Sequence, residues 1–191
     1  MGLVTNEEVE KYLGKEGDFS TEIAQVSAII RSILQNPVIR EEFTEHCDGG
    51  YRTLIVEHFP ILQDSVVIQD ANTGEVVNPS QYFIRGGRSR QIISRSGIWG
   101  LGMGRWEITY QAGLAATTEE VPADIKTAAL LLVKELVTGG SSGGIGDGEL
   151  KKETIGDYSY EKFSMAETVS FSSMVMSKVD ALLSKYKKVN I

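Results

Sequence analysis

The stretch WEITYQAGLAATTEEVPADIKTAALLLVKEL, residues 106–136, contains two hydrophobic periods in succession. Apolar and polar residues alternate at its start, which places Trp106, Ile108 and Tyr110 on one face and predicts a half-buried strand. From Pro122 onward the apolar residues recur at about 3.6 positions, the period of a helix. The stretch therefore marks the junction between a β-rich part of the chain and a helical part.

The helix predicted after this strand has signals at both ends. Pro122 suits a first helical turn, where its missing N–H costs nothing, and Asp124 complements the positive end of the helix dipole. Gly139 is expected to end the helix. Its buried stripe is predicted to consist of Ile125, Ala128, Ala129, Leu132, Val133 and Leu136.

Upstream of this junction, from Tyr51 to Tyr110, β-branched and aromatic residues occur in short runs separated by turn residues. An antiparallel meander or small barrel is the expected arrangement. The predicted strands lie at 51–57, 65–69, 81–84, 90–94 and 105–110.

Two helices are expected before the β-rich part. Thr5 and Glu8 have the spacing of a capping box, and the short helix that they begin should end near Gly14. A second helix starts at Ser20 or Thr21 and stops before Pro37. Its apolar face is predicted to be Ile23, Val26, Ile30, Ile33 and Leu34.

Beyond residue 138 the sequence GGSSGGIGDG is typical of a flexible linker. A terminal amphipathic helix is expected around residues 175–186, and because it follows a loose segment we expect it to have no core of its own. Its Met174 and Met176 would then suit an adaptable interface.

The fold class is therefore predicted to be α+β. It comprises a small bundle of about four helices, an inserted antiparallel β meander or small barrel, and a C-terminal helical arm. Residues 1–50 and 114–140 form the expected helical core, 51–113 the inserted β-rich domain, and 141–191 the linker and arm.

Composition limits the classes of function. The 191 residues carry a formal net charge of −7, which disfavours a protein that coats DNA. A single cysteine allows no intrachain disulfide and favours folding in a reducing cytoplasm. No apolar run approaches the roughly 20 residues of a membrane span, so no membrane association is expected.

The candidate catalytic and ligand-binding patterns are weak. His46, Cys47 and Asp48 are neighbours in sequence and cannot all converge on one metal, and nothing forces Cys47 to meet His58 as a nucleophile and base. Gly143 is not followed by the lysine of a phosphate-binding loop. We therefore expect no enzyme activity, no metal and no cofactor.

Four arginines, Arg85, Arg88, Arg90 and Arg95, surround a Gly-Gly turn. In a ring-shaped assembly they are candidate contacts to DNA in a channel, through phosphate attraction. The alternative is a soluble hairpin whose charges protect the edge of the sheet, and we favour this second interpretation.

Three stretches together resemble the head-tail connector (adaptor) family of tailed bacteriophages and prophages. They are the paired helices TNEEVEKYLG and STEIAQVSAIIRSIL, the WEITYQAG strand with the VPADIKTAALLLVKEL helix, and ETIGDYSYEKF at 153–163. None of these motifs is specific alone, but their order and spacing along most of the chain are informative. The β insert is larger than in the smallest members of the family.

This resemblance implies a structural virion protein without catalysis. Its copies, about twelve, would form a closed ring of head-to-tail contacts between the portal protein and the stopper or tail-completion protein, assembled in the host cytoplasm and located in the neck of the virion. It also implies a portal-binding arm, for which the candidate residues are Tyr158, Tyr160, Phe163, Met174, Met176, Val179, Leu182, Leu183 and Tyr186.

Two alternatives remain open from the sequence. One is another neck component, such as a stopper or tail-completion protein, although such proteins are typically β-dominated. The other is a nucleic-acid-binding module that uses the arginine hairpin to contact phosphates. A steep dependence of DNA affinity on salt would favour this second alternative.

Overall fold

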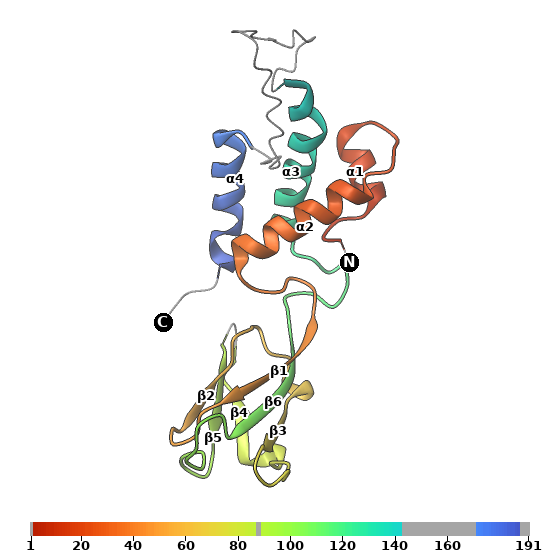
Figure 1. Cartoon of the computed structure of the whole chain (residues 1–191). Coiled ribbons are helices and arrows are strands. Elements are labelled where there is room, and N and C mark those ends of the chain that lie inside the picture. Colours follow the sequence, from red (N-terminus) through yellow and green to blue (C-terminus); the bar gives the residue numbers. More distant parts are fainter. Residues whose placement is uncertain (1, 87–88, 143–170, 188–191) are drawn as a thin grey trace, which may run out of the picture.

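The computed structural model describes residues 2–86, 89–142 and 171–187. In these residues a helical module and a β module are stacked end to end, which makes the molecule elongated (Figure 1). The helical module contains α1 (Asn6–Leu13), α2 (Ser20–Leu34), α3 (Ala123–Ser142) and α4 (Ser173–Leu183), and α4 continues into a 3-10 turn at Ser184–Tyr186. The α+β class predicted from the sequence is confirmed.

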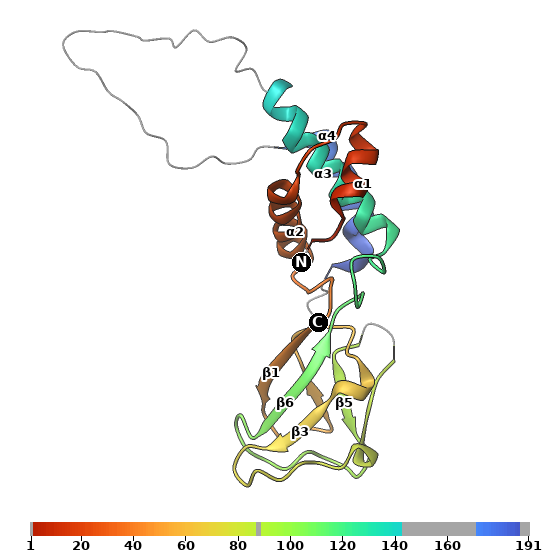
Figure 2. The ribbon, with the colours of Figure 1, turned by 90° about the vertical axis from the view of Figure 1, so that its right-hand side faces the viewer.

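The β module contains two three-stranded antiparallel sheets (Figure 2). One has the strand order β1-β6-β3 and the other β2-β5-β4. Short 3-10 turns at Gln63–Ser65 and Pro79–Gln81 precede β3 and β4. The strands are β1 (Glu41–Cys47), β2 (Thr53–Ile55), β3 (Val67–Asp70), β4 (Tyr82–Ile84), β5 (Gln91–Ser94) and β6 (Trp106–Ala112).

The helix ends follow from local sequence signals. The capping box of α1 forms as predicted: the Thr5 hydroxyl accepts from the Glu8 N–H at 3.2 Å, and the Glu8 carboxylate accepts from the Thr5 N–H at 2.9 Å. Gly14 caps the other end with φ of 66°, in the left-handed region.

The ends of α3 differ from the prediction. Pro122 lies just before the helix, where its carbonyl accepts from the Ile125 N–H at 2.9 Å. The helix also continues past Gly139 to Ser142, since glycine weakens a helix by only about 1 kcal/mol and does not remove a backbone donor.

Strand β1 was not predicted, and it lies within the range that the sequence analysis gave to the helical core. Its sequence EEFTEHC has polar residues on both faces, and only Phe43, Glu45 and Cys47 point inward, each partly buried. The strand is held instead by full antiparallel pairing with β6, from Glu41 opposite Ala112 to Cys47 opposite Trp106. A strand that is held mainly by hydrogen bonds to its neighbour does not need alternating apolar residues, so its own sequence does not predict it.

The other expected strands are present; β2, β3, β4 and β5 are shorter than expected, and β6 extends two residues further, to Ala112. In β6 every second residue is buried, so that Trp106, Ile108 and Tyr110 face the core as predicted. They meet Leu54 and Ile92 of the second sheet in one apolar cluster. The two sheets therefore enclose a single core and turn their other faces outward.

Helix α4 belongs to the helical core. The expectation that this helix has no core of its own is wrong, because Val179, Leu183 and Tyr186 are buried in the same cluster as the stripe of α3. The Tyr186 hydroxyl also donates to the Asp124 carboxylate at 3.3 Å, and Lys185 forms an ion pair with it. Apolar burial therefore brings the end of the described chain back onto α3.

The two modules are joined by two chain segments, which run side by side and are hydrogen-bonded to each other. The N–H groups of Leu114 and Ala115 donate to the Val38 carbonyl at 2.8 and 2.9 Å, and the Arg40 N–H donates to the Ala115 carbonyl at 2.8 Å. Gly113 makes this approach possible: its φ is 147°, and a Cβ there would lie 2.7 Å from backbone atoms of Arg40.

Leu183→Ala should lower the free energy of unfolding by about 2–5 kcal/mol, because it leaves a cavity in the helical core. Met174→Ala, on the exposed side of the same helix, should change it by less than about 0.5 kcal/mol. Chemical denaturation of the full chain measures both values. Equal, small effects would show that α4 does not pack on α3 in solution.

Trp106→Ala should lower the free energy of unfolding by about 3–5 kcal/mol. The indole is buried and packs edge-on against Trp99, with ring centroids 5.2 Å apart. The matched control is Leu101→Ala, five residues away and exposed to solvent. A loss below about 1 kcal/mol for Trp106→Ala would contradict the position of the indole between the sheets.

Candidate protein-contact surfaces

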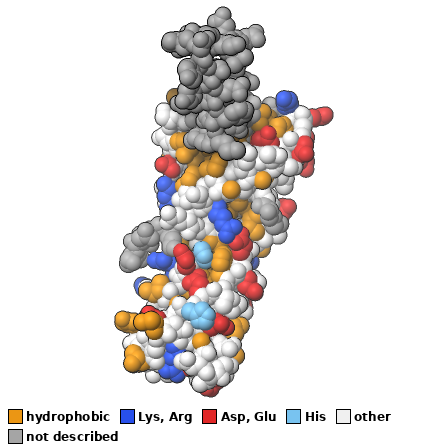
Figure 3. Space-filling view, in the orientation of Figure 1, with side chains coloured by type: hydrophobic (Ala, Val, Ile, Leu, Met, Phe, Trp, Pro, Cys, Tyr) orange, Lys and Arg blue, Asp and Glu red, His pale blue; other side chains and the backbone are white. Residues whose placement is uncertain are grey.

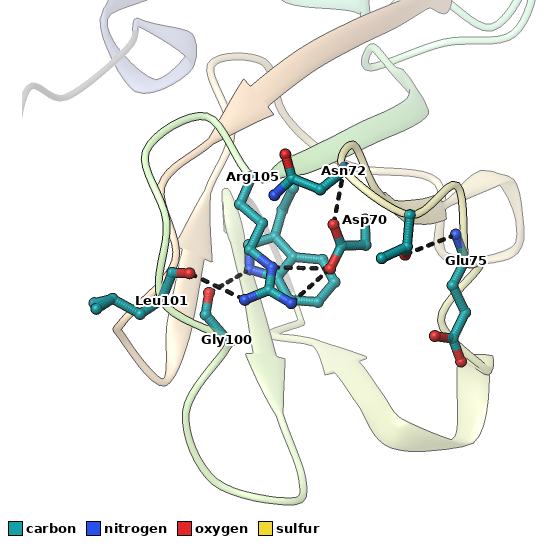
Figure 4. Close-up of polar contacts among 8 residues, drawn as sticks. Asp70, Asn72, Glu75, Gly100, Leu101 and Arg105 are labelled. Carbon is teal, nitrogen blue, oxygen red and sulfur yellow. Dashed lines mark hydrogen bonds and ion pairs between the residues drawn. The ribbon is translucent and has the colours of Figure 1, made fainter.

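A partly buried ion pair fixes the far end of the β module. The Asp70 carboxylate oxygen Oδ2 accepts from Nε and Nη2 of Arg105 at 2.8 and 2.7 Å. The remaining Nη1 donates to the Leu101 carbonyl at 3.0 Å, and the guanidinium lies 5.3 Å from the Trp106 ring centroid (Figure 4). One arginine thus ties strand β3 to the loop before β6.

Asp70 is held in place from its other side as well. Its Oδ1 accepts from the Asn72 N–H at 2.9 Å, within the turn that follows β3. The hydrogen bond from Arg105, followed by that from Asn72, lowers the pKa of the Asp70 carboxyl below its usual value.

The loop of residues 96–104 is fixed by further hydrogen bonds. The Trp106 indole donates to the Gly100 carbonyl at 3.1 Å, and the Gly49 N–H donates to the Gly102 carbonyl at 2.8 Å. A Cβ at position 49 would lie 1.7 Å from the Gly100 oxygen, so only glycine allows the two loops to approach so closely.

The same two loops present large apolar side chains to solvent. We call Tyr51, Ile98, Leu101 and Met103 the apolar tip; they are 68, 70, 80 and 93 % exposed. Hydrophobic side chains gather at this end of the molecule in Figure 3. A backbone held in one conformation beneath exposed apolar groups is typical of a contact site for another protein.

The apolar tip was missed in the sequence. Its residues Leu101 and Met103 lie in the glycine-rich run GLGMG at 100–104, between β5 and β6. Large apolar residues inside a glycine-rich turn, followed directly by an arginine, are the signal that was available.

The arginine cluster is only partly described. Arg85 and Arg95 are exposed on the outer side of β4 and β5, Arg90 is half-buried nearby, and Arg88 lies outside the described residues. The Arg85 guanidinium donates to the Gln91 side chain at 3.1 Å, and that of Arg95 lies 5.0 Å from the Phe83 ring centroid.

The candidate portal-binding residues fall into three groups. Val179, Leu183 and Tyr186 are buried against the chain's own helices and present no free surface in this conformation. Leu182 and Met176 are half-buried, and Met174 is 68 % exposed. The remaining three, Tyr158, Tyr160 and Phe163, lie outside the described residues.

The thiol of Cys47 is not set up as a nucleophile. Burial, and then the neighbouring Glu45 and Asp48 carboxylates, raise its pKa to about 11, so that it stays protonated at neutral pH. The thiol donates to the Ile55 carbonyl at 3.5 Å.

Within residues 2–86, 89–142 and 171–187, no group of three His, Cys, Asp or Glu side chains is placed to hold a metal ion. No helix in this part of the chain is long and apolar enough to cross a membrane. What the described residues do offer is surface for contacts with other macromolecules.

No protein-family model matches the sequence, and no curated protein is significantly similar to it. Solved structures are similar in fold. A chain in "Neck of empty GTA particle computed with C6 symmetry" has a TM-score of 0.60 and 15 % identity, with 99 % of this chain and 91 % of that chain covered.

Two further structures agree with the first. A chain in "Virion of native gene transfer agent (GTA) particle" has a TM-score of 0.58 and 17 % identity, over 99 % of this chain and 91 % of that chain. One in "Neck of native GTA particle computed with C12 symmetry" has a TM-score of 0.56 and 15 % identity, over 100 and 96 %. The chain is thus similar in fold to chains found in these particles, which supports the resemblance to head-tail connectors at the level of fold.

Asp70→Asn should lower the melting temperature at neutral pH, because it removes the charge that Arg105 pairs with. The pKa of Asp70 is lower in the folded chain than the value of about 3.9 in an unfolded one, so this stabilisation is present above that value and is lost as the pH falls through the folded pKa. Thermal unfolding of both proteins at a series of pH values should show the difference shrinking below about pH 4.

The control for this comparison is Glu75→Gln, which alters an exposed carboxylate in the turn after the same strand. It should leave the melting temperature almost unchanged. A difference between Asp70→Asn and the unaltered chain that stays constant down to strongly acidic pH would show that the Asp70–Arg105 pair does not form.

Proposed function

We propose that the protein is a structural component of the neck of a phage-like particle, and that it forms the adaptor ring between the portal vertex and the stopper or tail. The observation that carries this proposal is the likeness in fold to chains of neck structures over 99 to 100 % of its length. The order of sequence motifs, which resembles that of head-tail connectors, supports it independently.

The proposal includes a ring of identical copies, which the same comparison supports. Two of the similar structures were obtained with C6 and C12 symmetry. About twelve copies arranged head to tail would close such a ring, each using two different surfaces for its two neighbours. The proposed location is the virion neck, with assembly in the host cytoplasm.

The proposed role is architectural, with no catalysis and no cofactor. Its partners would be further copies of itself, the portal protein, and the stopper or tail-completion protein. Support comes from the described surface, where exposed apolar side chains lie in both modules: the apolar tip in loops of the β module and Met174 on α4. Separate exposed apolar sites suit a protein that contacts more than one neighbour.

The portal contact belongs to the C-terminal region in this proposal. Tyr158, Tyr160 and Phe163 stay as candidates, joined by Met174 and Met176. The buried residues Val179, Leu183 and Tyr186 have the different task of anchoring the arm to the helical module.

The test is light scattering coupled to size-exclusion chromatography, on the protein alone and mixed with the portal protein of the same particle. We expect a ring-sized species in at least one sample and a stable complex with portal. Met174→Glu should weaken that complex at least about tenfold, as a charge placed in an apolar contact does. Ser173→Glu, which adds the same charge one residue away on the helix, is the control.

A persistent monomer in both samples would contradict the proposed function. If instead the monomer bound DNA with an affinity that falls steeply with salt, the arginine hairpin would be explained as a nucleic-acid contact.

A further inference from the structure

The outward faces of the two sheets carry opposite charge. On the β1-β6-β3 sheet the alternate residues that point away from the core include the carboxylates Glu42 and Glu107. We call this outward side the acidic face; its residues are Glu42, Thr44, His46, Val67, Gln69, Glu107, Thr109 and Gln111.

The outward side of the β2-β5-β4 sheet carries arginines instead. Arg95 directly follows β5 and Arg85 directly follows β4, each alternating with an inward-facing residue. We call this side the arginine face; its residues are Thr53, Ile55, Phe83, Arg85, Gln91, Ile93 and Arg95.

Within the described part of the chain, the two arginines bond to neutral groups: Arg85 donates to the Gln91 side chain at 3.1 Å and Arg95 to the Tyr82 carbonyl at 3.2 Å. Neither Arg85 nor Arg95 forms an ion pair with a described acid, and Glu42 forms none with a described base. Glu107 has only His46 beside it, at 3.6 Å. Charges of opposite sign on two faces of one module are complementary to each other across a contact between copies.

Each face also exposes apolar surface. Ile55 on the arginine face is 57 % exposed and Val67 on the acidic face is 49 % exposed. On the arginine face Ile93 and Phe83 lie side by side in register and are partly buried. Apolar groups flanked by charges are the usual composition of a protein interface.

The position of the faces fits a ring. Both sheets contribute to one core, so their outward faces point away from each other. A contact that joins two different faces on opposite sides of a subunit is heterologous, and it builds a ring when a small rotation between successive copies adds up to a full turn.

We propose that neighbouring copies associate through their β modules, with the acidic face of one copy packed against the arginine face of the next. This inference rests on the proposed ring and identifies the surfaces that build it. The large β insert thus becomes the part of the subunit that sets its lateral contacts. Charge pairing fixes the order of the faces, and the apolar residues supply the buried area.

DNA is the competing occupant of the arginine face. Phosphates would use Arg85 and Arg95 but not Ile55 and Ile93, and the chain as a whole is negative, with a net charge of −7. A second copy of the chain uses both the charged and the apolar groups, and it alone accounts for the acidic face.

The test uses full-length chains with one face reversed in charge. The first variant carries Arg85→Glu and Arg95→Glu, and the second carries Glu42→Lys and Glu107→Lys. All four side chains lie on the outward faces, so circular dichroism should match that of the unaltered chain, and the melting temperature should fall only slightly because a few surface contacts are lost. Each variant alone should form at least about tenfold less ring than the unaltered chain under the same conditions, with portal included if the ring needs it.

An equimolar mixture of the two variants should restore the ring. In a mixed ring that alternates the two chains, every contact again joins opposite charges, and a chain with all four changes should assemble by itself for the same reason. Restoration in both samples would support the proposal. As a control, Asp64→Lys with Glu75→Lys changes the charge by as much outside the two faces and should leave assembly unaltered.

The outcomes separate this inference from the proposed function. If the unaltered chain forms rings and both variants do so equally well, the β modules do not make the contact, and the proposed function stands. If rings persist but Arg85→Glu and Arg95→Glu abolish a salt-dependent affinity for DNA, the arginine face serves DNA instead. If the unaltered chain forms no ring with or without portal, the proposed function fails and this inference with it.

Discussion

The architecture depends on the pairing of two connecting segments, Val38–Arg40 and Gly113–Ala115. Their backbone hydrogen bonds place the exit from the helical module beside the return to it, so that the β module is an insertion between α2 and α3. Two neighbouring contacts reinforce the pairing. The Arg31 guanidinium of α2 donates two hydrogen bonds to the Glu41 carboxylate, at 2.8 and 2.6 Å. The buried Asn36 side chain forms hydrogen bonds with the backbone N–H and carbonyl of Phe59. The modules are thereby held in one orientation, which a subunit of a regular ring requires.

The sequence was most informative where burial is complete. The alternation in Trp106, Ile108 and Tyr110 and the stripe of α3 predicted both elements correctly, because their apolar sides face one core each. Strand β1 was not predictable from its own residues, since pairing with β6 holds it in place. The attachment of α4 was also missed, because periodicity shows that a helix has an apolar face but not which surface covers it.

The candidate contact surfaces were also predictable only in part from the sequence. Arginines around a Gly-Gly turn were visible in the sequence, but their meaning depends on the opposite sheet, where Glu42 and Glu107 face outward. That relation arises only when the two sheets close over one core. The apolar tip depends likewise on Arg105 and on two loops that meet only in the folded chain. In each case tertiary placement converts scattered side chains into a surface that another molecule can recognise.

The most direct test of the account is an electron cryo-microscopy map of the protein assembled on its portal, or of the neck of the intact particle. We predict a closed ring of this chain next to the portal, with Glu42 and Glu107 of one copy within ion-pair distance of Arg85 and Arg95 of the next copy. A neck in which this chain is absent, or occupies a position that is not adjacent to the portal, would contradict the adaptor role.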